Sequence, residues 1–297
     1  MNWFYRLPDN LKGTLFLMLA SVLFSLMALL IKVVGQHLHI TQILLVRQLG
    51  MVLMVMPAII SNFPGALRSE RPGLQVLRLS FALVAMLGGF TAVIYMPLAD
   101  ATAIFFAKSF FITIFAVWFL GEIVGVYRWG AVVFGFVGVM IMLQPGTANF
   151  SIYSLAALAG AAGAAGVMVL LRILSRSDNA DTIMTWSSLG ISVAMAIPGI
   201  YYWKTPTMFE WCLLAILAVI SYFGQRCNIF AYKHGEASLL ASLDYVRLLW
   251  ATLLGFLVFD HIPGVPTWVG ASIVVAAAIF TIYREARRKQ SVQVELD

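Results

Sequence analysis

The sequence predicts an all-α membrane protein of ten transmembrane helices, built as two inverted five-helix repeats with both termini in the cytoplasm. Three observations lead to this prediction: the composition, the spacing of the apolar stretches and a similarity between the two halves of the chain. Of the 297 residues, 62% are hydrophobic and only 11% are charged. Soluble domains carry about 25% charged residues. The surroundings of this chain must therefore be lipid, at least in part.

Ten apolar stretches follow one another along the chain. Each has roughly the 20 residues that a helix needs to cross about 30 Å of hydrocarbon. The alternating pattern of a membrane β-barrel is absent, and helices are the other structure that satisfies its backbone in lipid. Short segments such as QPGTANF and DHIPGVPT supply the turns between stretches. The predicted spans are 13–34, 40–60, 74–95, 99–120, 126–143, 152–172, 180–202, 209–231, 237–259 and 266–283.

The basic residues between the spans predict the orientation. If the N-terminus is cytoplasmic, thirteen lysines and arginines fall on the cytoplasmic side, and Lys204 alone falls on the other. Cytoplasmic loops of membrane proteins are enriched in these residues. The net charge of +6 therefore reflects topology, and we expect no nucleic-acid partner. The cytoplasmic set is Arg6, Lys12, Arg68, Arg71, Arg78, Arg128, Arg172, Arg176, Lys233, Arg284, Arg287, Arg288 and Lys289.

The two halves of the chain resemble each other. YMPLADATAIFFAKSFF and FLGEIVGVYRWG in the first half correspond to YKHGEASLLASLDYVRL and VFDHIPGVPTWVG in the second. An odd number of spans repeated in tandem inserts the second unit upside down, an arrangement common among secondary transporters. We therefore expect two units, 1–148 and 149–297. The aligned pairs are Tyr95 with Tyr232, Asp100 with Glu236, Glu122 with Asp260 and Trp129 with Trp268.

On these motifs the chain resembles the drug/metabolite transporter superfamily, and within it the EamA-type ten-helix carriers. The resemblance covers nearly the whole chain and rests on the duplicated five-span unit, PLADATAIFF, FLGE with the downstream WGAVVFGFVGV, and Arg47 early in the second span. In the second half VFDHIPG replaces FLGE. The resemblance implies alternating-access transport of small metabolites without ATP, often the export of amino acids or related compounds.

Charged residues inside the spans are the candidates for a substrate site. Lys108 lies near the middle of the span 99–120, where an ionised side chain costs about 2.5–3.5 kcal/mol. It should therefore face a wet cavity or a partner. In the span 237–259, Asp244 aligns with Lys108, and Arg247 shares a helix face with Asp244. Either this cluster neutralises itself and is structural, or it lines the substrate site. Asp244 is also the candidate for proton coupling.

Arg226 adds a third cation, with Asn228 beside it. Three cations against one carboxylate favour an anionic or zwitterionic substrate, because arginine binds carboxylates through a bidentate fork. Aromatic side chains, with Tyr245 and Trp186 preferred, are expected to form walls of the site. Phe105, which precedes Lys108, and Tyr95 complete the candidate substrate-binding set.

These features predict a secondary active transporter in a bacterial inner membrane that exports a small carboxylated or amino-acid-like metabolite. Uptake or exchange of an organic anion or aromatic metabolite is the alternative, and a non-transporting membrane scaffold is a remote one. We expect no enzymatic activity, cofactor or metal, because no metal-ligand set, phosphate loop or nucleophile motif occurs. The expected partners are the lipid bilayer and the small-molecule substrate, and a homodimer is left open.

Overall fold

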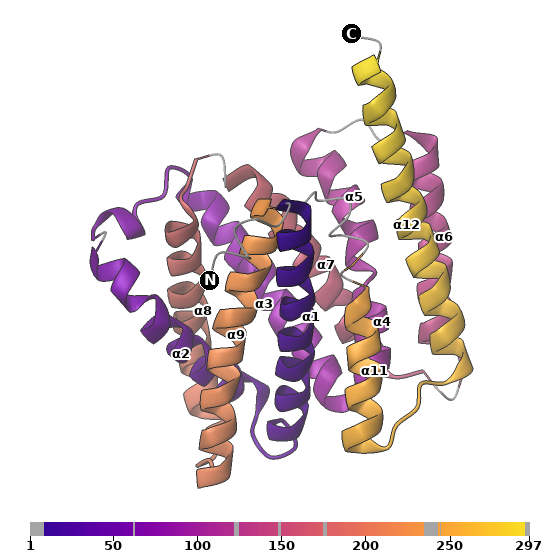
Figure 1. The fold of residues 1–297 in the computed structure, drawn as a ribbon. Coiled ribbons are helices and arrows are strands. Elements are labelled where there is room, and N and C mark those ends of the chain that lie inside the picture. The colour runs from indigo at the N-terminus through magenta and orange to yellow at the C-terminus, as the bar shows by residue number, and fades with distance from the viewer. Residues whose placement is uncertain are drawn as a thin grey trace.

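A computed structural model describes residues 9–61, 63–121, 125–147, 150–174, 177–234, 243 and 245–294. Within these residues the chain forms helices and their connections, with no strand (Figure 1). The helices are α1 (Asp9–Val34), α2 (Ile40–Ser61), the short 3₁₀ helix η2 (Gly65–Leu67), α3 (Pro72–Tyr95), α4 (Leu98–Phe105), α5 (Lys108–Leu120), α6 (Val126–Leu143), α7 (Ile152–Leu174), α8 (Ala180–Tyr201), α9 (Met208–His234), α11 (Val246–Phe259) and α12 (Val265–Val294).

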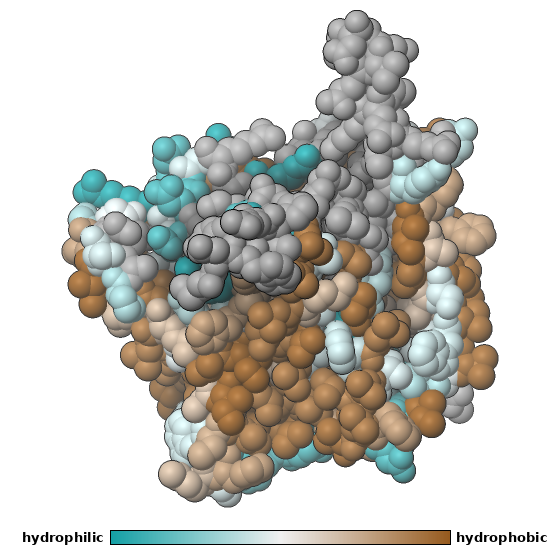
Figure 2. Space-filling view, viewed as in Figure 1, coloured by the Kyte–Doolittle hydropathy of each residue, from teal (hydrophilic) through white to brown (hydrophobic). Residues whose placement is uncertain are grey.

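The helices have the length and apolarity of membrane spans. In the described part of the chain, 7 helical segments are long and apolar enough to cross a membrane. Three shorter apolar helices accompany them, Trp129–Leu143, Val246–Phe259 and Val265–Ala277. Each of the ten predicted stretches overlaps one of these segments. Figure 2 shows apolar side chains across the middle of the visible face, with hydrophilic residues at its upper and lower edges.

The first and second halves of the chain interlock. The most extensive helix packing joins α3 to α7, α1 to α9, α6 to α12 and α2 to α8, and α4 packs against α11. In Figure 1, α1 and α9 lie at the front, and α6 and α12 lie together at one end of the bundle. Every one of these pairs takes one helix from each half. Neither half therefore buries its apolar surface by itself.

Glycines allow two of these helix pairs to approach closely. A Cβ added at Gly160 would lie 2.5 Å from the backbone nitrogen of Gly89, and one at Gly163 would lie 2.5 Å from that of Ala85. Between α6 and α12, a Cβ at Gly270 would meet the carbonyl oxygen of Gly138 at 2.4 Å. Small residues permit such backbone contacts between membrane helices. The glycines therefore fix how α3 sits on α7 and how α6 sits on α12.

The predicted span 99–120 is a broken helix. α4 ends at Phe105 and α5 begins at Lys108. Between them, the Phe106 and Ala107 amides donate to the carbonyls three residues earlier, at 3.2 and 3.0 Å, which is a tight 3₁₀ arrangement. The Ser109 hydroxyl also donates to the Phe106 carbonyl at 3.0 Å. Such side-chain bonds compete with the regular helix ladder, and the break places Lys108 at the start of a new helix.

Candidate functional site

The break between α4 and α5 lies against the beginning of α11. Tyr245 is the N-cap residue of α11, and its ring centroid lies 4.7 Å from that of Phe106. Phe106 is buried, whereas Tyr245 and Phe105 are half-buried at the edge of the same apolar cluster. A helix break from the first half thus meets a helix start from the second half. Binding sites of secondary transporters are typically formed where discontinuous helices meet.

Two of the predicted cations lie two residues after the aromatic residues Phe106 and Tyr245. Lys108 is the first residue of α5 and is half-buried. Arg247 is the second residue of α11, and its guanidinium lies 4.8 Å from the ring centroid of Phe24 on α1. Lys108 and Arg247 therefore come from the two helix starts that the Phe106–Tyr245 contact holds together. Asp244, the predicted carboxylate of this cluster, lies outside the described residues.

Polar atoms without hydrogen-bond partners occur on the helices next to this region. Among the described residues, the indole nitrogen of Trp250, one helical turn beyond Arg247, is buried without a hydrogen-bond partner, and so is the hydroxyl of Ser25 on α1. α1 packs against α11. Because most buried polar side-chain atoms in proteins are hydrogen-bonded, unpaired ones indicate a place where water or a ligand can bind.

Tyr95 and Trp186 contact residues other than Phe106 and Tyr245. Tyr95 is the last residue of α3, is 59% exposed and stacks on Tyr153 with a centroid separation of 4.5 Å. The indole nitrogen of Trp186 donates to the carbonyl oxygen of Leu67 at 3.1 Å. Trp186 is therefore hydrogen-bonded to the connection between α2 and α3. Both residues lie near helix ends.

Arg226 and Asn228 belong to α9. The Arg226 side chain is exposed, and its guanidinium lies 5.9 Å from the ring centroid of Tyr222 on the same helix. Asn228 is half-buried, and Phe223, three residues before Arg226, is 53% exposed. Residues three apart share a helix face. Arg226 thus lies on an exposed face of α9, and its role in substrate binding stays a prediction.

Sequence reasoning missed a further cation. Arg47 on α2 is only 6% exposed, and its Nε donates to the Ser221 hydroxyl on α9 at 2.7 Å. Its Nη1 donates to the Gln48 side-chain oxygen at 2.9 Å, and the guanidinium lies 5.6 Å from the Phe90 ring on α3. Arg47 lies within a predicted span, as Lys108 does, and a charged residue in a span is a candidate for a substrate site. In the sequence, Arg47 supports only the family resemblance, because the pattern does not show which side of the span it faces.

A second cluster joins the end of α1 to α3. The Lys32 ammonium donates to the carbonyl oxygens of Val93 and Met96, the first at 3.1 Å, and lies 5.3 Å from the ring of Phe259. A cation at a helix C-terminus satisfies carbonyls that lack intrahelical partners. Lys32 therefore fastens α1 to the point where α3 ends and α4 begins.

At the opposite end of α3, Asp178 in the connection between α7 and α8 binds the connection between α2 and α3. The Asp178 carboxylate accepts hydrogen bonds from the Gln75 amide at 2.7 Å, from the Glu70 backbone at 3.1 Å and from the Ser69 hydroxyl. Desolvation by burial opposes ionisation, but these hydrogen bonds prevail and lower the pKa of Asp178. The side chain of Arg78 continues the network to Gln75 at 3.2 Å.

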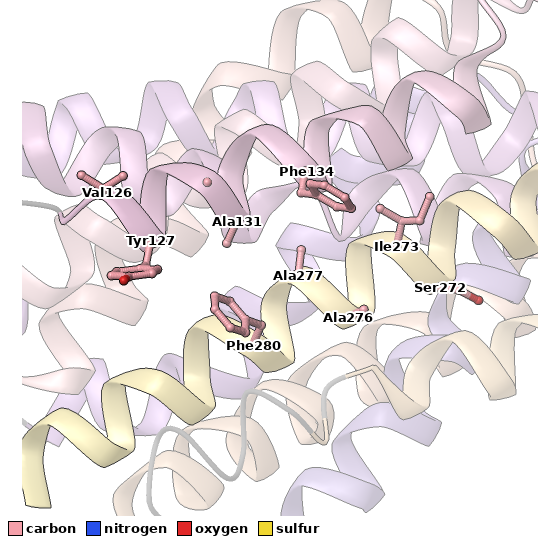
Figure 3. A pocket seen from close by; sticks show the side chains of 10 residues that line it. Val126, Tyr127, Ala131, Phe134, Ser272, Ile273, Ala276, Ala277 and Phe280 are labelled. Atoms are coloured by element: carbon pink, nitrogen blue, oxygen red, sulfur yellow. The ribbon is translucent and has the colours of Figure 1, made fainter.

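The groove in Figure 3 is more apolar than the region around Lys108 and Arg247. It holds about 660 Å³ between α6 and α12. Apolar side chains such as Phe134, Ile273 and Phe280 line it, and among the described lining residues the side-chain polar atoms are the hydroxyls of Tyr127 and Ser272. The Ser272 hydroxyl already donates to the carbonyl of Trp268 at 2.8 Å. The lining residues that the structure describes offer no charge to a carboxylated solute, unlike the region around Lys108.

The class of the protein follows from its apolar helices, which pack across the two halves of the chain. One of these helices is broken, and a charged side chain lies at the break. The protein is an integral multi-pass membrane protein of the transporter type. The chain belongs to the EamA-like transporter family, whose model matches residues 11–144 and again residues 151–283. This confirms the family resemblance found in the sequence, and the family and its named members are transporters rather than enzymes.

Several curated transporters are similar to this chain over nearly their whole length. An S-adenosylmethionine uptake transporter from Rickettsia prowazekii is 26% identical over 288 residues, covering 96% of this chain and 97% of the relative. A riboflavin transporter from Vibrio cholerae is 26% identical, with 94% and 96% covered. A pseudopaline exporter from Pseudomonas aeruginosa is 27% identical, with 91% and 96% covered. These relatives support transport activity and differ in substrate and direction.

A solved structure has the same fold. This crystal structure superimposes on 93% of this chain and 98% of its own, with a TM-score of 0.62 at 19% sequence identity. At that identity the likeness concerns the fold alone.

Proposed function

We propose that the protein is a secondary active transporter that moves a small carboxylated or amino-acid-like metabolite by alternating access. The observation that carries this proposal is the contact between the α4–α5 break and the start of α11, with Lys108 and Arg247 on the residues that follow. Helix breaks of this kind bind solutes and ions in transporters. A cation at each of these two helix starts favours a carboxylate, which arginine can bind through two hydrogen bonds.

The relatives support this class of substrate. S-adenosylmethionine, the solute named for the Rickettsia relatives, is an amino-acid derivative with a carboxylate group. The shared site chemistry would be recognition of that group by Lys108 and Arg247. Riboflavin, named for another relative, supports the aromatic metabolite of the alternative reading, with Tyr245 and Trp250 as ring contacts.

For the architecture we propose ten spans in two inverted repeats, residues 1–148 and 149–297, with cytoplasmic termini in a bacterial inner membrane. Two observations support this proposal. The family model matches the chain twice in succession. In addition, α1–α9 and α3–α7 are equivalent pairs under exchange of two such repeats, and α2–α8, α4–α11 and α6–α12 each join equivalent helices.

We propose export as the direction of transport, as for the pseudopaline exporter, with uptake as the second candidate because the Rickettsia relatives are named uptake transporters. Asp244 is proposed as the group that takes up a coupling proton. Vesicles that hold the protein in one orientation separate the two directions. An imposed proton gradient that drives transport by the wild type but not by Asp244→Asn would support the coupling role.

A thermal-shift screen tests the substrate class. The purified protein is heated with single metabolites, and each hit is repeated on Lys108→Ala and Asp244→Asn. We expect carboxylated solutes to stabilise the wild type and to lose this effect in Lys108→Ala, because the bound carboxylate loses a charged partner. Equal stabilisation of wild type and Lys108→Ala would remove Lys108 from the site. Hits confined to solutes without a carboxylate would reject the proposed class.

A further inference from the structure

We propose that Arg47 is a second anion-binding residue of this carrier, which receives the oxyanionic group of a transported solute when α2 and α9 separate. The inference rests on the proposed transport function and adds a residue and a location to it. It places this subsite on α2, between α3 and α9, where neither the family match nor the relatives assign one.

The first support is an uncompensated charge. Arg47 is 6% exposed, and its hydrogen-bond partners, Ser221, Gln48 and the Met86 sulfur, are all neutral. Among the described residues no carboxylate pairs with it. A buried cation without a counter-ion is strongly disfavoured, and ionisable groups inside membrane proteins mark substrate or ion pathways. An anionic solute would supply the missing charge.

The second support is the geometry of the guanidinium. Nε donates to Ser221 and Nη1 donates to Gln48, whereas Nη2 makes no hydrogen bond with any described residue. One edge of the planar fork thus retains an unused donor. A carboxylate binds such a fork through two parallel hydrogen bonds. It would use Nη2 and displace either the Ser221 hydroxyl or the Gln48 amide.

The third support is the position of Arg47 within the bundle. Arg47 lies seven residues after the start of α2 at Ile40, or about 10 Å along the helix axis. Ser25, whose buried hydroxyl has no partner, lies nine residues before the end of α1, or about 14 Å from it. These two helix ends are joined by a short connection, so Arg47 and Ser25 lie at similar depth. At this depth, the Arg47 guanidinium and the Ser25 hydroxyl therefore have hydrogen-bonding atoms that the described residues leave unused.

Cysteine labelling tests the proposal without knowledge of the solute. Ser221→Cys is made in a Cys212→Ser, Cys227→Ser background, and membranes are treated with sulfonatoethyl methanethiosulfonate, which is anionic, or with its cationic trimethylammonium counterpart. The measured quantity is the ratio of the two labelling rates. It is compared between Arg47, Arg47→Lys and Arg47→Gln. Gln48→Cys serves as a second reporter if Ser221→Cys does not fold, and Ser154→Cys on α7 is the control position.

We expect Arg47→Gln to lower the anionic-to-cationic ratio at position 221 by about tenfold, because a nearby unit charge changes reagent concentration by at least this much in a partly desolvated site. Arg47→Lys should retain most of the ratio, and Ser154→Cys should show no dependence on Arg47. An unchanged ratio in Arg47→Gln would overturn the proposal. Failure of both reagents to reach positions 221 and 48 would overturn it as well, because Arg47 would then only pin α2 to α9.

The labelling experiment can fail or succeed independently of the proposed transport function. A protein that transports a carboxylated solute but shows no Arg47-dependent ratio keeps the transport function and loses the second subsite. A protein with the Arg47-dependent ratio that transports no carboxylated solute keeps an anion site and loses the proposed transport function.

Discussion

The rings of Phe106 and Tyr245 lie 4.7 Å apart and inclined by 52°, and they join the broken helix of one half of the chain to a helix start in the other. Phe106 is 3% exposed. Lys108 and Arg247 each lie two residues beyond these rings, at the start of α5 and of α11. The aromatic contact thus joins the two chain segments that carry the cations of the proposed site.

A double-mutant cycle on Phe106→Ala and Tyr245→Ala measures this contact. The two substitutions should couple by about 0.5–1.5 kcal/mol, since a tilted aromatic pair contributes that much beyond its buried area. Thermal unfolding in detergent provides the energies. Combining Phe106→Ala with Trp203→Ala is the control, because Trp203 contacts Trp211 instead, and those effects should add. Additivity in the Phe106–Tyr245 cycle would show that the rings do not interact.

Removal of the charge at Lys108 should weaken binding of a carboxylated solute at least tenfold. A hydrogen bond to a charged group contributes about 1.5–3 kcal/mol, and Lys108→Gln removes the charge with little change in length. The ligand-induced rise in melting temperature measures the change, with Lys108→Arg as the charge-conserving variant. Lys204→Gln, at an exposed position, is the matched control and should leave binding unaltered. A comparable loss in both glutamine variants would point to a nonspecific charge effect.

The glycine contact between α3 and α7 predicts a steric difference between helical glycines. Gly163→Ala should destabilise the protein by about 1–3 kcal/mol, because its Cβ would meet the Ala85 nitrogen at 2.5 Å and overpacking costs about that much. Gly130→Ala on α6 should be neutral or stabilising by up to about 1 kcal/mol, since nothing lies within 4 Å of its Cβ and alanine is the better helix former. Melting temperatures compare the two. Similar destabilisation by both would contradict the packing described.

Asp178 should make stability depend on pH in the acidic range. Hydrogen bonds from Ser69, Gln75 and the Glu70 backbone lower its pKa in the folded protein. The group therefore binds fewer protons when folded, so its contribution is complete above the unfolded pKa of about 3.9 and is lost as pH falls through the lower folded pKa. Asp178→Asn should reduce the acid sensitivity of the melting temperature below about pH 4. Parallel pH profiles for the two proteins would exclude this role.

The apolar pattern allowed much of the fold to be predicted. Runs of hydrophobic residues placed helices where the structure has them, and motifs such as PLADATAIFF indicated the family that the comparison confirms. The break at Phe106–Ala107 was not predictable in this way. The surrounding stretch AIFFAKSFF is apolar throughout, and the interruption arises from local hydrogen bonds and from packing against Tyr245.

The candidate site was less predictable than the fold. The hydrophobic pattern indicates poorly how deep a residue lies in the membrane, and it hardly indicates which way its side chain faces. Trp186 was expected in the middle of a span, yet it lies only six residues after the start of α8 and bonds to the Leu67 carbonyl. Arg226 and Arg47 both occur in predicted spans, but one is exposed and the other is buried between three helices. Only tertiary packing distinguishes them.

Solute efflux from reconstituted vesicles tests the transport function and its central site together. Vesicles that contain wild-type protein or Lys108→Gln, and vesicles without protein, are loaded with a small-molecule extract of bacterial cells, and the loss of each compound is followed by mass spectrometry. We predict that one or a few carboxylated compounds leave the wild-type vesicles and are retained by the other two. Equal efflux from wild-type and Lys108→Gln vesicles, or no carboxylated compound lost from the wild type, would contradict transport through this site.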